Sequence, residues 1–260
     1  MISTMDPIGL DELTERAGLL TRIDRKYLVR LPDLDHVLDA LPDRTRVLQI
    51  DGRRQFGYRS VYFDTGDLLS YRLTAWRRRR RFKIRTRSYL DSGINLLEVK
   101  TRGPRGATVK QRLPYQGDGE QLVDRDREMA HTALSRSGAT TPPSADDLQP
   151  TLITNYHRAT LFLPQSSSRV TIDTELTWTL PDDSGQRQLE GYAVVETKCS
   201  GAAAEMDRAL WAHQHRPTSI SKFGTGLAAL RPDLPAHRWH LVLSRHLDPS
   251  RHLHQKEHLS

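Results

Sequence analysis

Residues 82–89 read FKIRTRSY and place three cations at alternate positions. Lys83, Arg85 and Arg87 fall on one side of this segment, whereas Phe, Ile and Thr occupy the other side. A period of two is typical of a β-strand with one face against a core. Guanidinium and ammonium groups match phosphate oxygens in geometry and charge. This spacing therefore predicts an ordered strand that presents cations to an anion.

Charged residues recur with the same spacing on most other segments that resemble strands. They are Asp24 and Lys26, Glu98 and Lys100, Lys110 and Arg112, Tyr156 and Arg158, Arg169 to Glu175 at every second position, and Glu196 and Lys198. For any single strand, the solvent side of an ordinary antiparallel sheet is a sufficient explanation. That explanation weakens over seven strands, because crowded cations repel by about 1 kcal/mol per pair even in water. We expect an anion or a few carboxylates to offset this repulsion.

Three carboxylates on these strands add a second kind of chemistry. Glu98, Asp173 and Glu196 are hard oxygen ligands that suit Mg²⁺ or Mn²⁺. Because such ions bridge phosphate groups, the cations and the carboxylates together predict a site for a polyanionic phosphate chain with a divalent metal.

The elements that position these side chains follow from the same periodicity. Strands are predicted at 22–29, 58–65, 82–89, 94–101, 107–115, 151–163, 169–178 and 189–199. Helices are predicted at 11–17, 34–41, 67–76, 119–137, 202–215 and 225–230. About eight antiparallel strands can close into a barrel with room for a ligand. We therefore expect an α+β fold in which a closed antiparallel β-barrel forms a basic tunnel, with helices packed outside.

Three segments are expected along the chain: a helical segment at 1–19, the tunnel domain at 20–236 and a flexible, His-rich tail at 237–260. The histidine spacing of this tail does not match a metal site. The run Arg77–Arg81 is expected to form a solvated rim of the tunnel, with Arg79 and Arg81 continuing the face of Lys83. A docking patch for acidic lipid or polyphosphate is the alternative for this run.

Composition limits the classes of partner. The chain has 39 Lys and Arg against 32 Asp and Glu, a net charge of +7, which favours anionic partners. No apolar run reaches the roughly 18 residues of a membrane span, and the N-terminus has no secretory h-region. Cys199 is the only cysteine, which fits a cytoplasmic location. Sequence-specific nucleic-acid binding is not expected, because the basic residues lie on strands and no docking-helix motif occurs.

The ordered set of motifs resembles a known family over about residues 20–230. The matching motifs are Asp24-x-Lys26-Tyr27, Ser60-x-Tyr62-Phe63-Asp64-Thr65, Lys83-x-Arg85-x-Arg87-x-Tyr89, Glu98-x-Lys100, Tyr156-x-Arg158, Arg169 to Thr174, Glu196-x-Lys198 and Ser221-Lys222-Phe223. They are similar to the VTC domain, the polyphosphate polymerase domain of vacuolar transporter chaperone complexes. This domain belongs to the triphosphate tunnel metalloenzymes, together with CYTH-type phosphatases and cyclases.

The resemblance implies transfer of the γ-phosphate of ATP to inorganic phosphate or to a polyphosphate chain. It implies catalytic roles for Lys26, Arg85, Arg87, Lys100, Arg158, Arg169 and Lys198. Substrate-binding roles follow for Lys83, Lys110, Arg112, Tyr156, Ser221 and Lys222. Glu196 is the main expected ligand of Mn²⁺ or Mg²⁺, supported by Glu98 and Asp173. Two positions depart from the family pattern: Asp24 stands where Glu is usual, and Phe223 where Tyr is common.

Two other functions stay open at the level of sequence. One is hydrolysis of tripolyphosphate or nucleoside triphosphates in the same site. The other is a non-catalytic module that binds polyphosphate or nucleotide, serving a membrane-protein partner. The three carboxylates argue against the binding module, because an anion sensor gains nothing from acids beside its ligand. Tyr27 and Tyr62 are expected in the core, and Asp64 either caps the following helix or serves the site.

Overall fold

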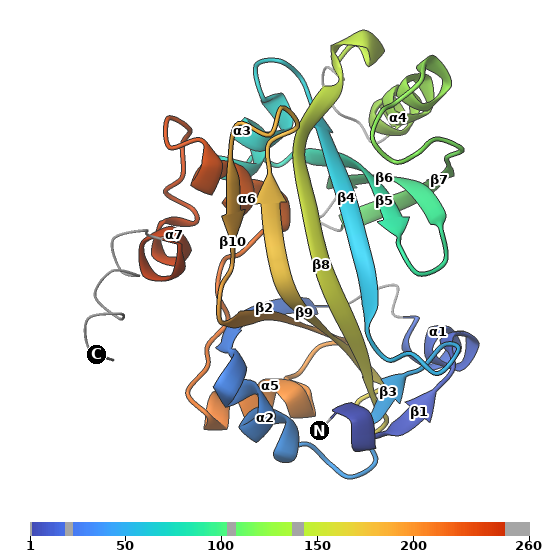
Figure 1. Ribbon diagram of the computed structural model, residues 1–260, viewed down its shortest axis with the longest axis vertical. Coiled ribbons are helices and arrows are strands. Elements are labelled where there is room, and N and C mark those ends of the chain that lie inside the picture. Colours follow the sequence, from blue (N-terminus) through green and yellow to red (C-terminus); the bar gives the residue numbers. More distant parts are fainter. Residues whose placement is uncertain (1, 19–22, 103–107, 137–142, 248–260) are drawn as a thin grey trace. The chain divides into compact units, whose positions relative to one another are not determined.

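The computed structural model describes residues 2–18, 23–102, 108–136 and 143–247, and its ribbon is shown in Figure 1. Within the chain two compact units are distinguished. The first comprises residues 1–57, 156–176 and 189–220, and the second comprises 58–155, 177–188 and 221–260. Each unit is described by itself below.

The first unit is a sheet with helices on it. Its elements are η1 (Ile2–Thr4), β1 (Asp6–Ile8), α1 (Leu10–Ala17), β2 (Ile23–Arg30), α2 (Leu31–Asp39), β3 (Arg46–Leu48), most of β8 (Gln149–Leu163) and of β9 (Ser168–Thr179), β11 (Tyr192–Cys199) and α5 (Glu205–Ala212). The strand order is β2-β11-β9-β8, and β3 pairs with both β8 and β1. The β2–β11 and β11–β9 pairs are antiparallel, whereas β1 and β3 run parallel.

The core of the first unit lies on one side of this sheet. Alternate residues of β2, β9 and β11, such as Tyr27, Val170 and Val195, are fully buried there. The helices α2 and α5 cover this side and contact each other (Figure 1). In α2, Leu34, Val37 and Leu38 are buried at the spacing of one helix face, after a proline in the first turn. The intervening strand residues must therefore face the other way.

The second unit holds the remaining strands and helices. They are β4 (Phe56–Asp64), α3 (Leu69–Ala75), β5 (Phe82–Tyr89), β6 (Ile94–Arg102), β7 (Thr108–Pro114), α4 (Asp124–Arg136), η3 (Ala145–Asp147), β10 (Gln186–Gln188), α6 (Lys222–Leu230) and α7 (His240–His246). The order is β8-β4-β5-β6-β7, and β10 pairs with the end of β9. The β4–β5, β5–β6 and β6–β7 pairs are antiparallel.

The second unit has a core of its own. Phe63, Ile84, Leu97 and Val99 lie on one side of β4, β5 and β6, where residues of α4 cover them. Figure 1 shows α4 beside β6 and β7. The cations of β5 alternate with this buried set, so the side predicted for each residue of β5 is the side observed.

Two glycines allow α6 to approach large aromatic side chains. A Cβ atom on Gly224 would lie 2.1 Å from Cζ2 of Trp239, and one on Gly226 would lie 2.0 Å from Cδ1 of Trp178. The indole Nε1 of Trp178 also donates a hydrogen bond to the carbonyl oxygen of Lys222. These contacts fix the start of α6 in the second unit.

The α+β class is confirmed, with seven α-helices and a large antiparallel sheet among the described residues. The expectation of a closed barrel is wrong. The strand order begins at β2 and ends at β7, and within the described chain each of these two strands pairs with a single neighbour. Closure requires hydrogen bonding on both edges of every strand, which alternation along separate strands does not reveal.

Two expectations about loops and ends also change. Residues 77–81 form turns and coil, and β5 begins only at Phe82, so Arg79 does not continue the strand. Within the segment expected as a tail, α7 forms a helix and Trp239 is buried, whereas 248–260 lies outside the described residues.

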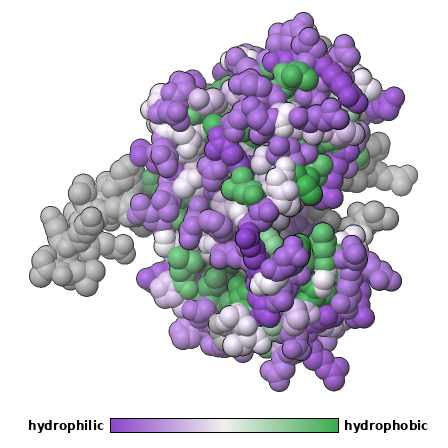
Figure 2. All heavy atoms as spheres, turned by 45° about the vertical axis from the view of Figure 1, so that its right-hand side comes forward, coloured by the Kyte–Doolittle hydropathy of each residue, from purple (hydrophilic) through white to green (hydrophobic). Residues whose placement is uncertain are grey.

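On the face drawn in Figure 2, hydrophobic side chains appear as scattered groups among hydrophilic ones. Of the helices described, none has the length and apolar character required to cross a membrane.

Candidate functional site

The side of the second unit's sheet opposite its core is ionic. Two rows of directly opposite residues cross its strands: Tyr62, Arg85, Glu98 and Arg112 in one, and Lys83, Lys100 and Lys110 in the other. Residues directly opposite in antiparallel strands share a face of the sheet. These seven residues and Arg87 are called the second ionic face.

Glu98 is the centre of the second ionic face and is fully buried. Arg85 donates to its Oε2 from Nε at 2.9 Å and from Nη2 at 2.6 Å. Lys110 forms an ion pair with Oε1, and Arg87 and Arg112 approach the same oxygen at 3.9 and 3.6 Å. Four cations thus surround one carboxylate. The carboxylate neutralises one of their positive charges, so three remain to be neutralised by another anion.

Electrostatics keep Glu98 ionised. Burial alone would raise the pKa of this carboxyl, but the charges of Arg85, Arg87 and Lys110 hold it far below its ordinary value. The pKa of Lys110 is lowered to about 8, because burial and the nearby charges of Arg87 and Arg112 outweigh the attraction of Glu98. An ammonium group with a lowered pKa gains most from an additional anion, which would stabilise its charged form.

Aromatic side chains hold the cations of β5 in place. The guanidinium of Arg85 lies 5.7 Å from the ring centre of Tyr62 and donates to its hydroxyl at 3.0 Å. Tyr62 stacks on Phe223 of α6 with ring centres 5.0 Å apart. Lys83 donates from Nζ to Oγ of Ser221 at 2.9 Å. Ser221 caps α6 by accepting from the backbone N–H of Gly224, so the start of α6 is tied directly to β5.

Arg87 retains a hydrogen-bond donor without an acceptor. Its side chain is 9% exposed and its guanidinium lies 5.6 Å from the ring centre of Tyr58. Among the residues that the structure describes, Nε of Arg87 has no hydrogen-bond acceptor. A buried polar group without a partner is costly, so this donor favours an added acceptor.

The first unit carries a similar surface on the side opposite its core. One row of opposite residues is Asp24, Lys198 and Arg169, and the next is Lys26, Glu196 and Thr171. These six residues with Tyr156, Arg158 and Asp173 are called the first ionic face. Lys198 binds Glu196 at 3.0 Å and donates to Oγ1 of Thr171 at 3.3 Å, and Lys26 lies 4.0 Å from Glu196.

Arg158 and Asp173 form the strongest pair of the first ionic face. The guanidinium donates from Nε and Nη2 to the two carboxylate oxygens at 2.6 and 2.8 Å. It also lies 5.2 Å from the ring centre of Tyr156. Burial, with the charges of Arg158 and Arg169, lowers the pKa of Lys198 to about 8 although Glu196 opposes the shift. This face therefore also concentrates cations that are only partly compensated.

A family model of the VTC domain matches residues 21–231 of this chain. The chain belongs to the VTC domain family. The match includes every residue of both ionic faces, and it confirms the relationship inferred from the motifs.

Solved structures resemble this VTC domain only distantly. A putative adenylyl cyclase from Hippeastrum, described as having a dominant triphosphatase activity, is 13% identical, covers 84% of this chain and 100% of its own, and has a TM-score of 0.45. A conserved hypothetical protein from Pyrococcus furiosus is 12% identical over 74% of this chain and 88% of its own, with a TM-score of 0.39. The Pct1 RNA triphosphatase of S. pombe is 14% identical over 84% of this chain and 65% of its own, with a TM-score of 0.25. No curated protein matches the sequence.

The carboxylates of the VTC domain do not form a ready metal centre. Asp173 and Glu196 lie on the first ionic face and Glu98 on the second, and each is bound to cations. Within the described ranges, no three acidic, His or Cys side chains group closely enough to hold a metal ion. The described residues therefore do not fit a preformed metal site, and the roles predicted for these acids remain predictions.

Residues that the sequence did not indicate support the first ionic face from behind. Asp207 of α5 is fully buried and accepts from Tyr27 Oη at 2.7 Å, Thr197 Oγ1 at 2.6 Å and Arg25 Nη1 at 3.2 Å. These donors alternate with Lys26, Glu196 and Lys198 along β2 and β11. Asp207 was missed because an acid in a short helix gives no sign that it is buried.

Three minor predictions are resolved. Tyr27 and Tyr62 are buried as expected, although Tyr62 also contacts Arg85. Asp64 accepts from the backbone N–H groups of Ser70 and Tyr71 at the start of α3, so it caps this helix.

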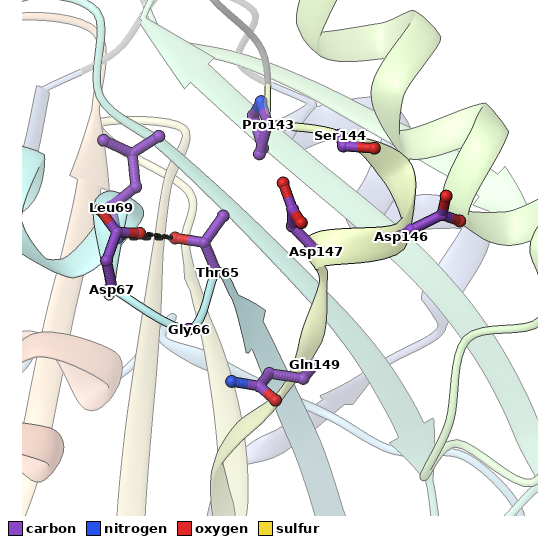
Figure 3. A pocket seen from close by; sticks show the side chains of 9 residues that line it. All are labelled: Thr65, Gly66, Asp67, Leu69, Pro143, Ser144, Asp146, Asp147 and Gln149. Atoms are coloured by element: carbon purple, nitrogen blue, oxygen red, sulfur yellow. Dashed lines mark hydrogen bonds between the residues drawn. The ribbon is translucent and has the colours of Figure 1, made fainter.

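A separate pocket of about 750 Å³ lies in the second unit, beside α3 (Figure 3). Asp67, Asp146 and Asp147 line it, together with Gln149, Leu69 and neighbouring residues. None of the predicted site residues lines it. Three acids make it a poor place for phosphate groups, so the ionic faces remain the candidate site.

Proposed function

We propose that this VTC domain is a phosphotransferase that moves the γ-phosphate of ATP onto inorganic phosphate or a polyphosphate chain. The surplus of cations around the buried Glu98 is the observation on which this proposal depends. A carboxylate that holds four cations in one place lowers their mutual repulsion but leaves a net positive charge. A triphosphate is an anion of the right kind to neutralise it.

The protein needs to supply little covalent chemistry for this reaction. An oxygen of the acceptor phosphate forms a bond to the γ-phosphorus, the bond to the β–γ bridging oxygen breaks, and ADP leaves. Charge builds on the transferred group and on the leaving oxygen, so cations in fixed positions stabilise the transition state. On the second ionic face, Arg85, Arg87 and Lys110 are the cations whose geometry fits this role best, because neighbouring groups hold them and each is largely buried.

A divalent cation remains part of the proposal but no step is assigned to it. Mg²⁺ commonly binds one or two carboxylates and completes its shell with water and substrate phosphates. Glu196 is the most accessible of the three acids, with 18% of its side chain exposed. We expect Glu196→Gln to abolish Mn²⁺-dependent turnover while leaving tripolyphosphate binding in the absence of metal measurable by calorimetry. Full turnover in this variant would show that Glu196 does not bind the metal.

The products of ATP turnover test the proposed activity. Purified protein is incubated with ATP and Mn²⁺, and the products are separated on a gel. A ladder of long chains supports polymerisation, free phosphate alone supports the hydrolase, and neither product with retained tight binding supports the binding module.

A matched pair of variants links the activity to the second ionic face. Arg85→Ala removes one donor and should lower turnover by about 100-fold. Arg59→Ala is the control, because this arginine pairs with Glu120 in the loop after β7 and belongs to neither face. Equal activity in both variants would contradict the assignment of Arg85.

A further inference from the structure

A second group of arginines lies at the start of β5 and the end of β6, where the second ionic face stops. Residues 77–81 form a five-arginine connection between α3 and β5, and the first four are exposed. Arg77 has a φ of +54°, a left-handed conformation that is uncommon for an arginine. The chain thus turns sharply after α3 and holds successive guanidinium groups at the surface.

The register of β5 and β6 joins these arginines to the second ionic face. Lys83 lies opposite Lys100, and Phe82 lies opposite Thr101. Arg81 directly precedes Phe82 in the connection from α3, and Arg102 follows Thr101 on β6. Because side chains alternate along a strand, Arg102 lies on the same side as Lys100. The basic row of the second ionic face therefore continues past the start of β5.

The arginines in this group act on one another. Burial, with the charges of Arg102 and Arg238, lowers the pKa of Arg81, and burial with Arg77 and Arg102 lowers that of Arg238. Four guanidinium groups from three segments of the second unit are thus close enough to repel. These four together with Arg78, Arg79 and Arg80 are called the arginine extension.

Parts of the arginine extension are held in place. Arg238 donates from Nη1 to the carbonyl oxygen of Thr74 at 2.8 Å and lies 5.8 Å from the ring centre of the buried Trp239. Its Nε is buried and has no acceptor among the described residues. Arg81 donates to the carbonyl oxygen of Arg78 at 3.0 Å. Cations fixed this close favour an anion that offsets their repulsion.

We propose that the arginine extension binds the distal part of a polyphosphate chain whose near end lies on the second ionic face. This inference rests on the proposed function, because it assumes that the second ionic face holds phosphate. A chain long enough to pass beyond Lys83 and Lys100 would meet Arg81 and Arg102 next, and then the exposed arginines. A tripolyphosphate would fill the second ionic face alone. The extension would therefore add affinity only for long chains.

An acidic lipid surface fits the observations less well. Trp76, which is 45% exposed, is the one large apolar side chain exposed within the connection from α3 to β5. Membrane-surface binding usually combines cations with a broader apolar contact. A site that follows a linear polyanion is expected to continue from the basic row of the sheet. A site for a lipid headgroup would not need this continuity.

The test compares two ligand lengths. Affinities of the whole protein for tripolyphosphate and for long-chain polyphosphate are measured by calorimetry at one salt concentration. The test variant is Arg78→Glu with Arg79→Glu, and the control is Arg125→Glu with Arg187→Glu, which changes the same charge at exposed arginines elsewhere in the second unit. We expect the test variant to lose about tenfold in long-chain affinity and to keep its tripolyphosphate affinity, whereas the control changes neither by as much.

Several outcomes would overturn the inference. An equal loss for both lengths would show a general charge effect, and no loss would show that the extension is not used. If the test variant lost binding to phosphatidylserine vesicles but not to the long chain, the partner would be a membrane surface. If wild-type protein bound longer chains no more tightly than tripolyphosphate, this inference alone would be contradicted. If it bound neither ligand, the proposed function would be contradicted as well.

Discussion

Glu98 shows how one buried acid organises cations on a sheet. It is enclosed by Arg85, Arg87, Lys110 and Arg112, and its charge is the one that offsets theirs. The sequence predicted that Glu98 shares a face with these cations, because spacing by two fixes the side of a strand. It did not predict the ion pairs, since partners depend on strand register, which a single strand does not encode.

Replacing Glu98 with glutamine should destabilise the protein strongly. The variant keeps the size of the side chain but leaves buried cations without compensation, which typically costs about 3–5 kcal/mol. Added tripolyphosphate should restore part of the lost melting temperature, because it supplies the missing negative charge. Thermal unfolding with and without tripolyphosphate measures both effects.

The control for this variant is Glu120→Gln. Glu120 pairs with Arg59 at a position where both side chains are about one-third exposed. Loss of such a pair costs roughly 0–1 kcal/mol. Equal destabilisation of the two variants, or no rescue of Glu98→Gln by the anion, would contradict the role given to Glu98.

Asp64 predicts a pH dependence of stability. Burial raises its pKa to about 6, although three backbone N–H groups oppose this shift. Between its ordinary value of 3.8 and about 6, the folded state binds more protons at this residue than the unfolded state. This contribution to stability is complete below about pH 4, declines as the pH rises to about 6 and is absent above it.

The Asp64→Asn variant isolates this contribution. We expect the free energy of unfolding of wild-type protein to fall by up to about 3 kcal/mol relative to the variant between pH 4 and pH 7. Chemical denaturation at several pH values measures the difference. A difference that is constant over this range would show that Asp64 has an ordinary pKa in the folded protein.

At the scale of elements, periodicity predicted the long strands and most helices, but it did not predict the short elements. The predicted strand at 94–101 corresponds to β6 (Ile94–Arg102), and that at 151–163 to β8. Three-residue strands such as β1, β3 and β10 are too short to show an alternation. The predicted strand at 82–89 matches β5, but five consecutive arginines carry no polarity pattern, so the sequence did not show that Arg79 lies outside the strand.

The close packing of α6 gives a prediction at this scale. Alanine in place of a helical glycine normally stabilises a helix by up to about 1 kcal/mol. Gly226→Ala should instead destabilise by roughly 1–3 kcal/mol, because the added Cβ would overlap the fully buried ring of Trp178.

Gly201→Ala is the matched control, since an added Cβ there meets nothing within 4 Å. Thermal unfolding of both variants gives the comparison. A Gly226→Ala protein as stable as the control would show that α6 does not pack against Trp178 in this way. The packing of α6 would then no longer explain how Ser221 and Lys222 are held at its start.

At the scale of the whole molecule, the net charge of +7 pointed to an anionic partner, and both ionic faces carry that charge in ordered positions. The closed barrel was an incorrect inference from the sequence. Each strand reveals which residues share a side, but closure depends on the pairing of strands far apart in the chain. The division of the chain into two compact units leaves no mark in composition or periodicity.

A crystal structure of the protein with bound tripolyphosphate would test the central claim most directly. The account predicts phosphate oxygens within hydrogen-bond distance of Arg85, Arg87 and Lys110, with the ion pairs to Glu98 retained. Tripolyphosphate bound solely at other surfaces, with the cations around Glu98 unchanged and without contact to it, would contradict the account.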